Sequence, residues 1–197
     1  MNALNATSGF ADRSITGPLD SSEVKELRPL HDFGSLRVPN RTDVSIRVEV
    51  EETTGQVIAV SIDLADSNIH LQAFASPRNE ALWNEIRANI SQSITSQGGR
   101  VAEKIGSFGA ELLSEVATKD EQGKSIAKRH LKFLGIDGPR WFLRIVVSGA
   151  AITDPAASGA VDDLIRGIVV NRGETPMPPR ELLPLIMPAG SASLAKR

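Results

Sequence analysis

Strict alternation of apolar and polar residues in segment 43–76 is the feature of this sequence that most restricts its fold. The first run alternates valine and isoleucine with polar residues from Val44 to Val50, as expected for a strand with one buried face. Similar runs follow at 57–64 and 69–75, each after a short turn segment. Such short connections join antiparallel strands, because a parallel crossover needs about a dozen residues. An antiparallel meander with one face to be covered is therefore predicted.

Two amphipathic helices are predicted to supply that cover. The first opens at Ser76-Pro77, repeats apolar residues at every fourth position from Leu82 to Ile94, and ends at Gly98-Gly99. The second opens at Asp154-Pro155, carries apolar residues at helical spacing and ends at Gly173.

Short apolar runs between the two predicted helices complete the pattern. They lie at residues 100–105, 110–117, 126–134 and 140–148, and the last is the clearest strand. The sequence thus runs twice through a meander and then a helix, without a repeat of fixed period. We predict an α+β fold, with one or two antiparallel sheets in two meander-then-helix units, covered by two amphipathic helices.

Composition along the chain suggests one folded domain with two extended ends. The length of 197 residues favours a single core. Residues 1–30 are rich in small polar residues, glycine and proline, so they are predicted to form a flexible leader. Residues 31–173 form the predicted α+β domain, and residues 174–197 a proline-rich extended tail.

Charge, cysteine content and hydropathy exclude several classes of protein. A formal charge of −2 argues against a protein that holds nucleic acid through its phosphates. The absence of cysteine removes disulfides, thiolate metal sites and thiol nucleophiles. No signal-type apolar segment follows the N-terminus, and no apolar run approaches the ~20 residues that span a bilayer. We expect a cytoplasmic protein that does not insert into a membrane.

Motifs for catalysis, metals and cofactors are not evident. The three histidines, His31, His70 and His130, have no metal-ligand spacing, and no phosphate-binding glycine loop or nucleophile elbow occurs. We predict no metal, no cofactor and no catalytic residue. His31, Asp32 and Ser35 are better explained by a turn into the first strand, in which Asp32 or Ser35 bonds nearby backbone amides.

The segment from Asp137 to Arg144 is the most informative for function. A tight turn at Asp137-Gly138-Pro139 leads into a strand whose alternation puts Arg140, Phe142 and Arg144 on one side. Two such arginines could grip an anion or the carboxylates of a partner. The structural alternative, which we favour on the sequence, is that Arg140 pairs with Asp137 or another acid and that Trp141 fills the core.

Four separated segments resemble a known family. They are DFGSLRVP at 32–39, LQAFASPR at 71–78, DGPRWFLR at 137–144 and PPRELLPL at 178–185. They resemble landmarks of an actinobacterial family known only as domain-of-unknown-function family 3710, over residues 17–188. The resemblance implies a cytoplasmic protein without an assigned activity, so it carries over no catalytic residue.

Two classes of function remain open on the sequence. The leading hypothesis is a non-enzymatic module that binds a protein partner or a small ligand, with candidate binding residues Arg140, Arg144, Asp137 and Asp32. The alternative is a small hydrolase or transferase that uses Asp32, Asp137 and His130 as acid and base groups and holds an anionic substrate through Arg140. Nucleic acid is not an expected partner, whereas an exposed sheet edge could pair two copies of the chain.

Overall fold

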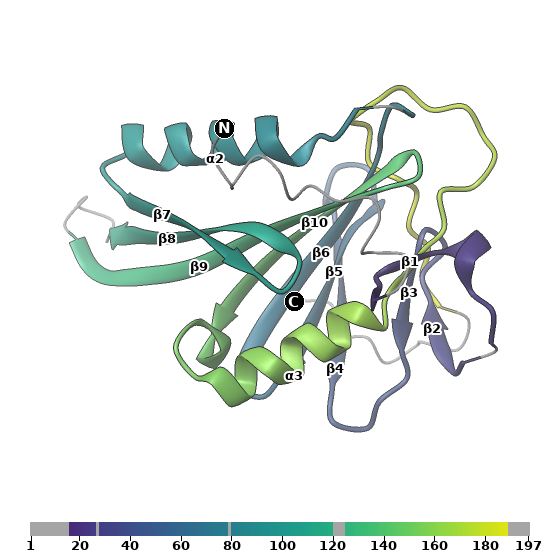
Figure 1. The fold of residues 1–197 in the computed structure, drawn as a ribbon, viewed down its shortest axis with the longest axis horizontal. Helices are drawn as coiled ribbons and strands as arrows, with labels where there is room; N and C mark the ends of the chain where they lie inside the picture. The colour runs from purple at the N-terminus through teal and green to yellow at the C-terminus, as the bar shows by residue number, and fades with distance from the viewer. Residues whose placement is uncertain (1–15, 27, 79, 120–124, 189–197) are drawn as a thin grey trace.

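A computed structural model describes residues 16–26, 28–78, 80–119 and 125–188 of the chain (Figure 1). Its main element is a seven-stranded antiparallel sheet in the order β4-β5-β6-β10-β9-β8-β7. The strands are β4 (Ser45–Val50), β5 (Val57–Leu64), β6 (Ser67–Ala75), β7 (Arg100–Gly106), β8 (Gly109–Lys119), β9 (Ser125–Gly138) and β10 (Trp141–Gly149). The predicted α+β class is confirmed, and the two meanders share one sheet because β6 pairs with β10.

The two helices lie on opposite faces of this sheet (Figure 1). Helix α3 (Pro155–Arg166) follows the 3-10 turn η3 (Ala150–Ile152) and packs on the face that carries the main apolar core. The side chain of Asp154 accepts a bond from the Ala156 amide, so this helix opens where the sequence predicts. Helix α2 (Trp83–Ser96) lies above the β7–β9 end of the sheet.

Helix α2 begins later than the predicted opening at Ser76-Pro77. Its N-cap residue, Leu82, has no capping side chain of its own. The carboxylate of Asp137, which belongs to β9, accepts bonds from the amides of Leu82 and Trp83 instead. A cap supplied from a distant strand therefore fixes where α2 starts, and local sequence does not encode it.

The structure also contains a second sheet, of four strands, which was not predicted from the sequence. Its order is β1-β11-β3-β2, and its strands are β1 (Leu19–Asp20), β2 (Leu30–Asp32), β3 (Leu36–Pro39) and β11 (Val169–Val170). The sheet is mixed because β1 and β11 run parallel. Within the predicted leader, the structure describes residues 16–26 and 28–30, which contain β1, the 3-10 turn η2 (Ser21–Glu23) and the start of β2. Residues 1–15 lie outside the described part.

The described part of the C-terminal segment runs beside β6. The amide of Ala75 donates to the carbonyl of Glu181 at 2.8 Å, and the amide of Leu183 donates to that of Ala73 at 2.8 Å. Leu183 and Leu185 are buried, whereas Ile186 is exposed. These residues join the core along the part of β6 that β5 does not pair.

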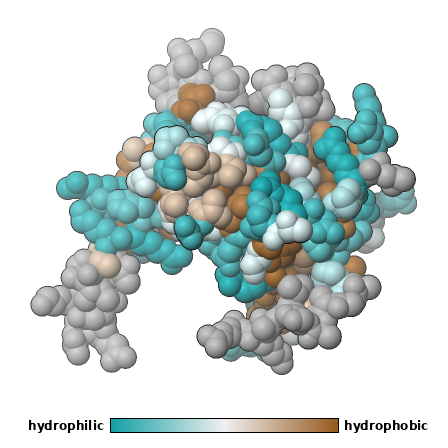
Figure 2. Space-filling view, turned by 90° about the horizontal axis from the view of Figure 1, so that it is seen from below, coloured by the Kyte–Doolittle hydropathy of each residue, from teal (hydrophilic) through white to brown (hydrophobic). Residues whose placement is uncertain are grey.

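The face of the molecule that points down in Figure 1 is mainly polar. Figure 2 shows hydrophilic residues over most of this face, with hydrophobic residues in separate areas. In the described ranges, neither helix is long and apolar enough to cross a membrane.

Candidate functional site

One face of the seven-stranded sheet is divided into an apolar and a polar half. On β9 and β10 this face carries Phe133 and Phe142, which belong to the apolar cluster around Leu82 and Trp83 of α2. On β4, β5, β6 and β10 the same face carries a set of polar side chains that we call the open face: Arg47, Glu49, Ser61, Asp63, Asn68, His70, Gln72 and Arg144. Arg47 and Glu49 at its outer end have side chains 52% and 46% exposed.

Most charged groups on the open face are already paired. Arg47 forms an ion pair with Asp63 at 2.7 Å, and the same carboxylate accepts a bond from Asn68 at 2.8 Å. Glu49 accepts a bond from the hydroxyl of Ser61 at 3.1 Å, and its other oxygen lies 3.1 Å from Nε2 of His70. The charged groups Arg47, Glu49 and Asp63 thus already have polar partners on this part of the face.

The group of Ser61, Glu49 and His70 does not form a catalytic triad. A nucleophilic serine requires an imidazole next to its hydroxyl, with the carboxylate behind the imidazole. Here the carboxylate lies between the hydroxyl and the imidazole. The order is therefore unsuited to activating Ser61.

Arg144 differs from the other charged residues of the open face. Its position on β10 is opposite Gln72 on β6, and one of its terminal nitrogens donates to Oε1 of Gln72. The guanidinium carbon lies 5.4 Å from the centre of the Phe74 ring. The Nε atom is buried and has no hydrogen-bond partner among the described residues. Burial lowers the pKa of the guanidinium. In the described part of the chain Arg144 forms no ion pair, so it is a half-buried cation with unused donors.

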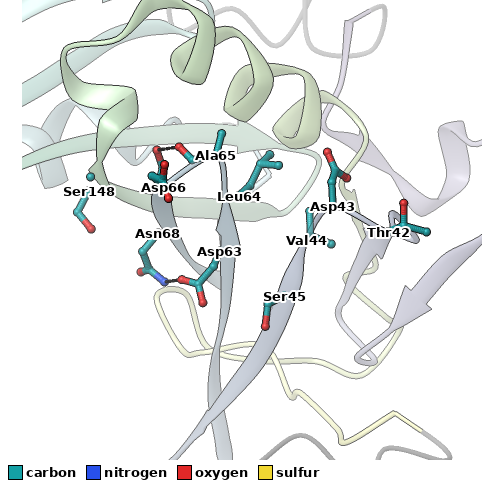
Figure 3. Close-up of a pocket in the computed structure, with 12 residues that line it drawn as sticks. Thr42, Asp43, Val44, Ser45, Asp63, Leu64, Ala65, Asp66, Asn68 and Ser148 are labelled. Carbon is teal, nitrogen blue, oxygen red and sulfur yellow. Dashed lines mark hydrogen bonds between the residues drawn. The ribbon is translucent and has the colours of Figure 1, made fainter.

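Two depressions border the open face near β4 and β5. The larger, of about 1060 Å³, is lined in part by Arg47, Glu49, Ser61 and Asn68. The other, of about 650 Å³, is acidic, because Asp43, Asp63 and Asp66 line it (Figure 3).

The carboxylates of the acidic depression are largely engaged. Figure 3 shows Asn68 bonded to Asp63, which also pairs with Arg47. Arg41 binds Asp43 at 2.5 Å, and this hydrogen bond lowers the pKa of that carboxyl. Among the residues that the structure describes, no group of three histidine, aspartate or glutamate side chains is placed to hold a metal ion.

Asp137, a predicted binding residue, is part of the framework of α2. Its two oxygens accept bonds from the amides of Leu82 at 2.7 Å and Trp83 at 3.3 Å. Burial raises the pKa of Asp137, and the two amide bonds act in the opposite direction. Asp137 therefore caps helix α2 and does not pair with Arg140, as one of the alternatives from the sequence had it.

Asp32, another predicted binding residue, lies in the four-stranded sheet. It accepts a bond from the Gly34 amide at 2.8 Å, which confirms the predicted backbone bond at this turn. Its second oxygen binds Arg37 at 3.1 Å. The structure does not bring Asp32, Asp137 and His130 together: Asp137 caps α2, and His130 lies on β9 opposite Glu115.

Arg140 lies in the turn between β9 and β10 and has a φ of 64°. This left-handed conformation interrupts the alternation, so the predicted alignment of Arg140 with Arg144 on one strand face is wrong. Burial lowers the pKa of Arg172, and the positive charge of the nearby Arg140 adds to this effect. Sequence reasoning missed Arg172, because the second predicted helix extends to Gly173 and would include it. In the structure α3 ends at Arg166 instead.

Comparisons with known proteins place the chain in a family. The solution structure of cyanobacterial PsbP (CyanoP) from Synechocystis sp. PCC 6803 is similar, with 11% sequence identity, a TM-score of 0.43, and coverage of 78% of this chain and 99% of that chain. No curated protein matches the sequence. The family described as "Protein of unknown function (DUF3710)" matches residues 17–193. The match spans most of the sequence, and the chain belongs to the DUF3710 family.

Proposed function

We propose that this protein is a non-enzymatic binding module that docks an acidic partner protein on its open face, where Arg144 receives a carboxylate. The observation that supports the proposal is the state of the Arg144 side chain. It is half-buried, it has a buried Nε without a hydrogen-bond partner, and it forms no ion pair with a described residue. A desolvated cation of this kind gains most from a carboxylate, which accepts charge-assisted bonds.

The surroundings of Arg144 support a protein partner more than a small molecule. Pockets for small molecules are concave and mainly apolar. The open face is the surface of a sheet, and polar as well as apolar side chains line the depression of about 1060 Å³ that borders it. Arginine next to aromatic residues is common at the centre of protein interfaces. Arg144 over Phe74, bordered by the paired groups of Glu49 and His70, fits that description.

Chemical-shift perturbation in NMR spectra would test the proposal with defined probes. The probes are an Asp- and Glu-containing hexapeptide and the matching Asn- and Gln-containing peptide. We expect the acidic peptide to shift the signals of Gln72, Phe74 and Arg144, and the amide peptide to leave them unchanged. Arg144→Gln removes the charge, so it should abolish these shifts, whereas the control Arg41→Gln should retain them.

Two outcomes would contradict the proposal. One is equal shifts with the acidic and the amide peptide, which would mean that charge does not matter. The other is binding of the acidic peptide that Arg144→Gln leaves unchanged. Arg41 is a suitable control because it is also half-buried but already has the carboxylate of Asp43 as its partner.

A further inference from the structure

Arg172 is a second arginine whose buried Nε has no hydrogen-bond partner within the described ranges. Among the described residues, the buried side-chain nitrogen and oxygen atoms without a hydrogen bond are the Nε atoms of Arg144 and Arg172. Such atoms are rare in folded proteins, and an unseen ion is one of their causes. Arg172 follows β11 in the four-stranded sheet, so the open face does not explain it.

Arg140 and Arg172 approach the same short strand from two parts of the chain. Asp20 of β1 is paired in register with Val170, and its carboxylate accepts a bond from Nε1 of Trp141 at 2.8 Å. Arg172 comes two residues after Val170, and Arg140 immediately precedes Trp141. The contacts of Asp20 thus bring the two arginines into one region, in agreement with the effect of the Arg140 charge on the pKa of Arg172.

The nearby carboxylate does not neutralise this pair of cations. Asp20 is buried, and its oxygens already accept bonds from Trp141 and from the amide and hydroxyl of Ser22. One terminal nitrogen of Arg172 donates to the carbonyl of Thr175 at 2.9 Å, and most of its other donors have no acceptor among the residues that the structure describes. In the described ranges neither Arg140 nor Arg172 takes part in an ion pair.

We infer that Arg140 and Arg172 form a second binding site, for a dianionic oxyanion of the phosphate class. Two neighbouring guanidinium groups carry two positive charges and present planar forks of donors, which match the charge and the oxygens of a phosphate group. A single carboxylate would neutralise only half of this charge. The ligand is either inorganic phosphate or a phosphate monoester. Its binding does not depend on the proposed site on the open face.

Thermal unfolding of the full chain in low-salt buffer tests this site. The melting temperature is measured with increasing inorganic phosphate and, for comparison, with chloride at the same ionic strength. We expect phosphate, but not chloride, to raise the melting temperature of the wild type and of Arg41→Gln. Arg140→Gln and Arg172→Gln should each weaken the binding of phosphate about tenfold or more, because each removes one of the two guanidinium groups.

The phosphate-free samples separate a binding role from a structural one. Loss of one of two neighbouring like charges relieves repulsion, so Arg140→Gln should melt no lower than the wild type without phosphate and lower than the wild type with it. Lower melting in both conditions would mean that Arg140 only supports the turn, and would overturn the inference. Unchanged affinity in both variants would overturn it as well.

Calorimetric titration with inorganic phosphate and with glycerol phosphate distinguishes the two sources. Binding of both, or of the free ion alone, supports the site, and binding of neither contradicts it. Should Arg172→Gln fail to fold, Arg172→Lys keeps the charge but not the planar fork, and is expected to weaken phosphate binding. Arg144→Gln should leave phosphate binding intact. The phosphate site and the proposed docking of an acidic partner on the open face can therefore be refuted separately.

Discussion

The two halves of one sheet face are held by different forces. Under α2, Trp83 is 2% exposed, its ring centre lies 6.2 Å from that of Phe142, and its Nε1 donates to the carbonyl of Ala110 at 2.6 Å. On the open face, the contacts are pairs such as Arg47 with Asp63, whose side chains are 52% and 39% exposed. Buried aromatic rings contribute several kcal/mol, whereas an exposed ion pair contributes between zero and about 1 kcal/mol.

This difference shows why the open face can be used for binding. Strands β5 and β6 are anchored on their other face, where Ile62, Ile69 and Leu71 are completely buried. Stability therefore depends only weakly on which side chains the open face presents. We expect substitutions under α2 to lower the free energy of unfolding much more than substitutions on the open face.

Replacement of Trp83 should have the largest effect. Trp83→Ala removes a buried ring and its bond to Ala110, so we expect a loss of about 3–5 kcal/mol in the free energy of unfolding. His70→Ala, a matched truncation on the open face, should cost less than about 1 kcal/mol. Denaturant unfolding measures both, and equal losses would show that the two halves do not differ.

Removal of the cap of α2 should have the next largest effect. Asp137→Ala leaves the amides of Leu82 and Trp83 without their acceptor, so we expect a loss of about 1–3 kcal/mol. Asp137→Asn keeps an acceptor oxygen and should cost less. Hydrogen exchange of the α2 amides would locate the effect, and an unchanged exchange rate at the start of α2 in Asp137→Ala would contradict the capping role.

The same residue predicts a dependence of stability on pH. The pKa of Asp137 is raised in the folded state, mainly by burial, so between the unfolded value of about 3.9 and the folded value the folded chain binds more protons. The part of the stability that depends on protonation of Asp137 is therefore complete at low pH and is lost as the pH rises through the folded pKa. The free energy of unfolding of the wild type, minus that of Asp137→Asn, should therefore be larger at pH 3 than at pH 7.

The regular elements were predictable from the sequence because their signals are local. Alternation located β5 and β6, and the Asp154 cap with its following proline located the start of α3. The open side of the sheet also follows from alternation, since it places Arg144 opposite the buried residues of β10. The order of the strands was not predictable, because periodicity does not say which edge of one meander pairs with the other.

The features that sequence reasoning missed depend on contacts between distant segments. Asp137 lies 55 residues from the amide of Leu82 that it caps. Strands β1 and β11 have two residues each, too few to show any alternation. The approach of Arg172 to Arg140 depends on the same small sheet, so no local pattern could have suggested it.

Removal of the contact between Glu49 and His70 on the open face should have a small effect. Glu49→Gln weakens the contact with His70, whose side chain is 24% exposed while that of Glu49 is 46% exposed. We expect a loss below about 1 kcal/mol, reduced further by salt, because solvent screens the pair. A larger loss in denaturant unfolding would show that the open face contributes to stability.

Replacement of Arg144 should have the smallest effect on stability. Arg144→Met gives up one hydrogen bond to Gln72 and the contact with Phe74, but it also removes a buried Nε that has no partner. Since these two changes oppose each other, we expect the free energy of unfolding to stay within about 1 kcal/mol of the wild type.

Arg87 of α2 is the control for Arg144, because it is an arginine on the half of the sheet face that α2 covers. It also lies over an aromatic ring, that of Trp83, but it is 5% exposed and its donors bind Glu103 at 3.2 Å and Asn84 at 3.1 Å. Arg87→Met leaves both acceptors without their donor, so it should cost about 1–3 kcal/mol. A protein that loses as much stability with Arg144→Met as with Arg87→Met would use both arginines for its fold, and Arg144 would then have no donors to spare for a partner.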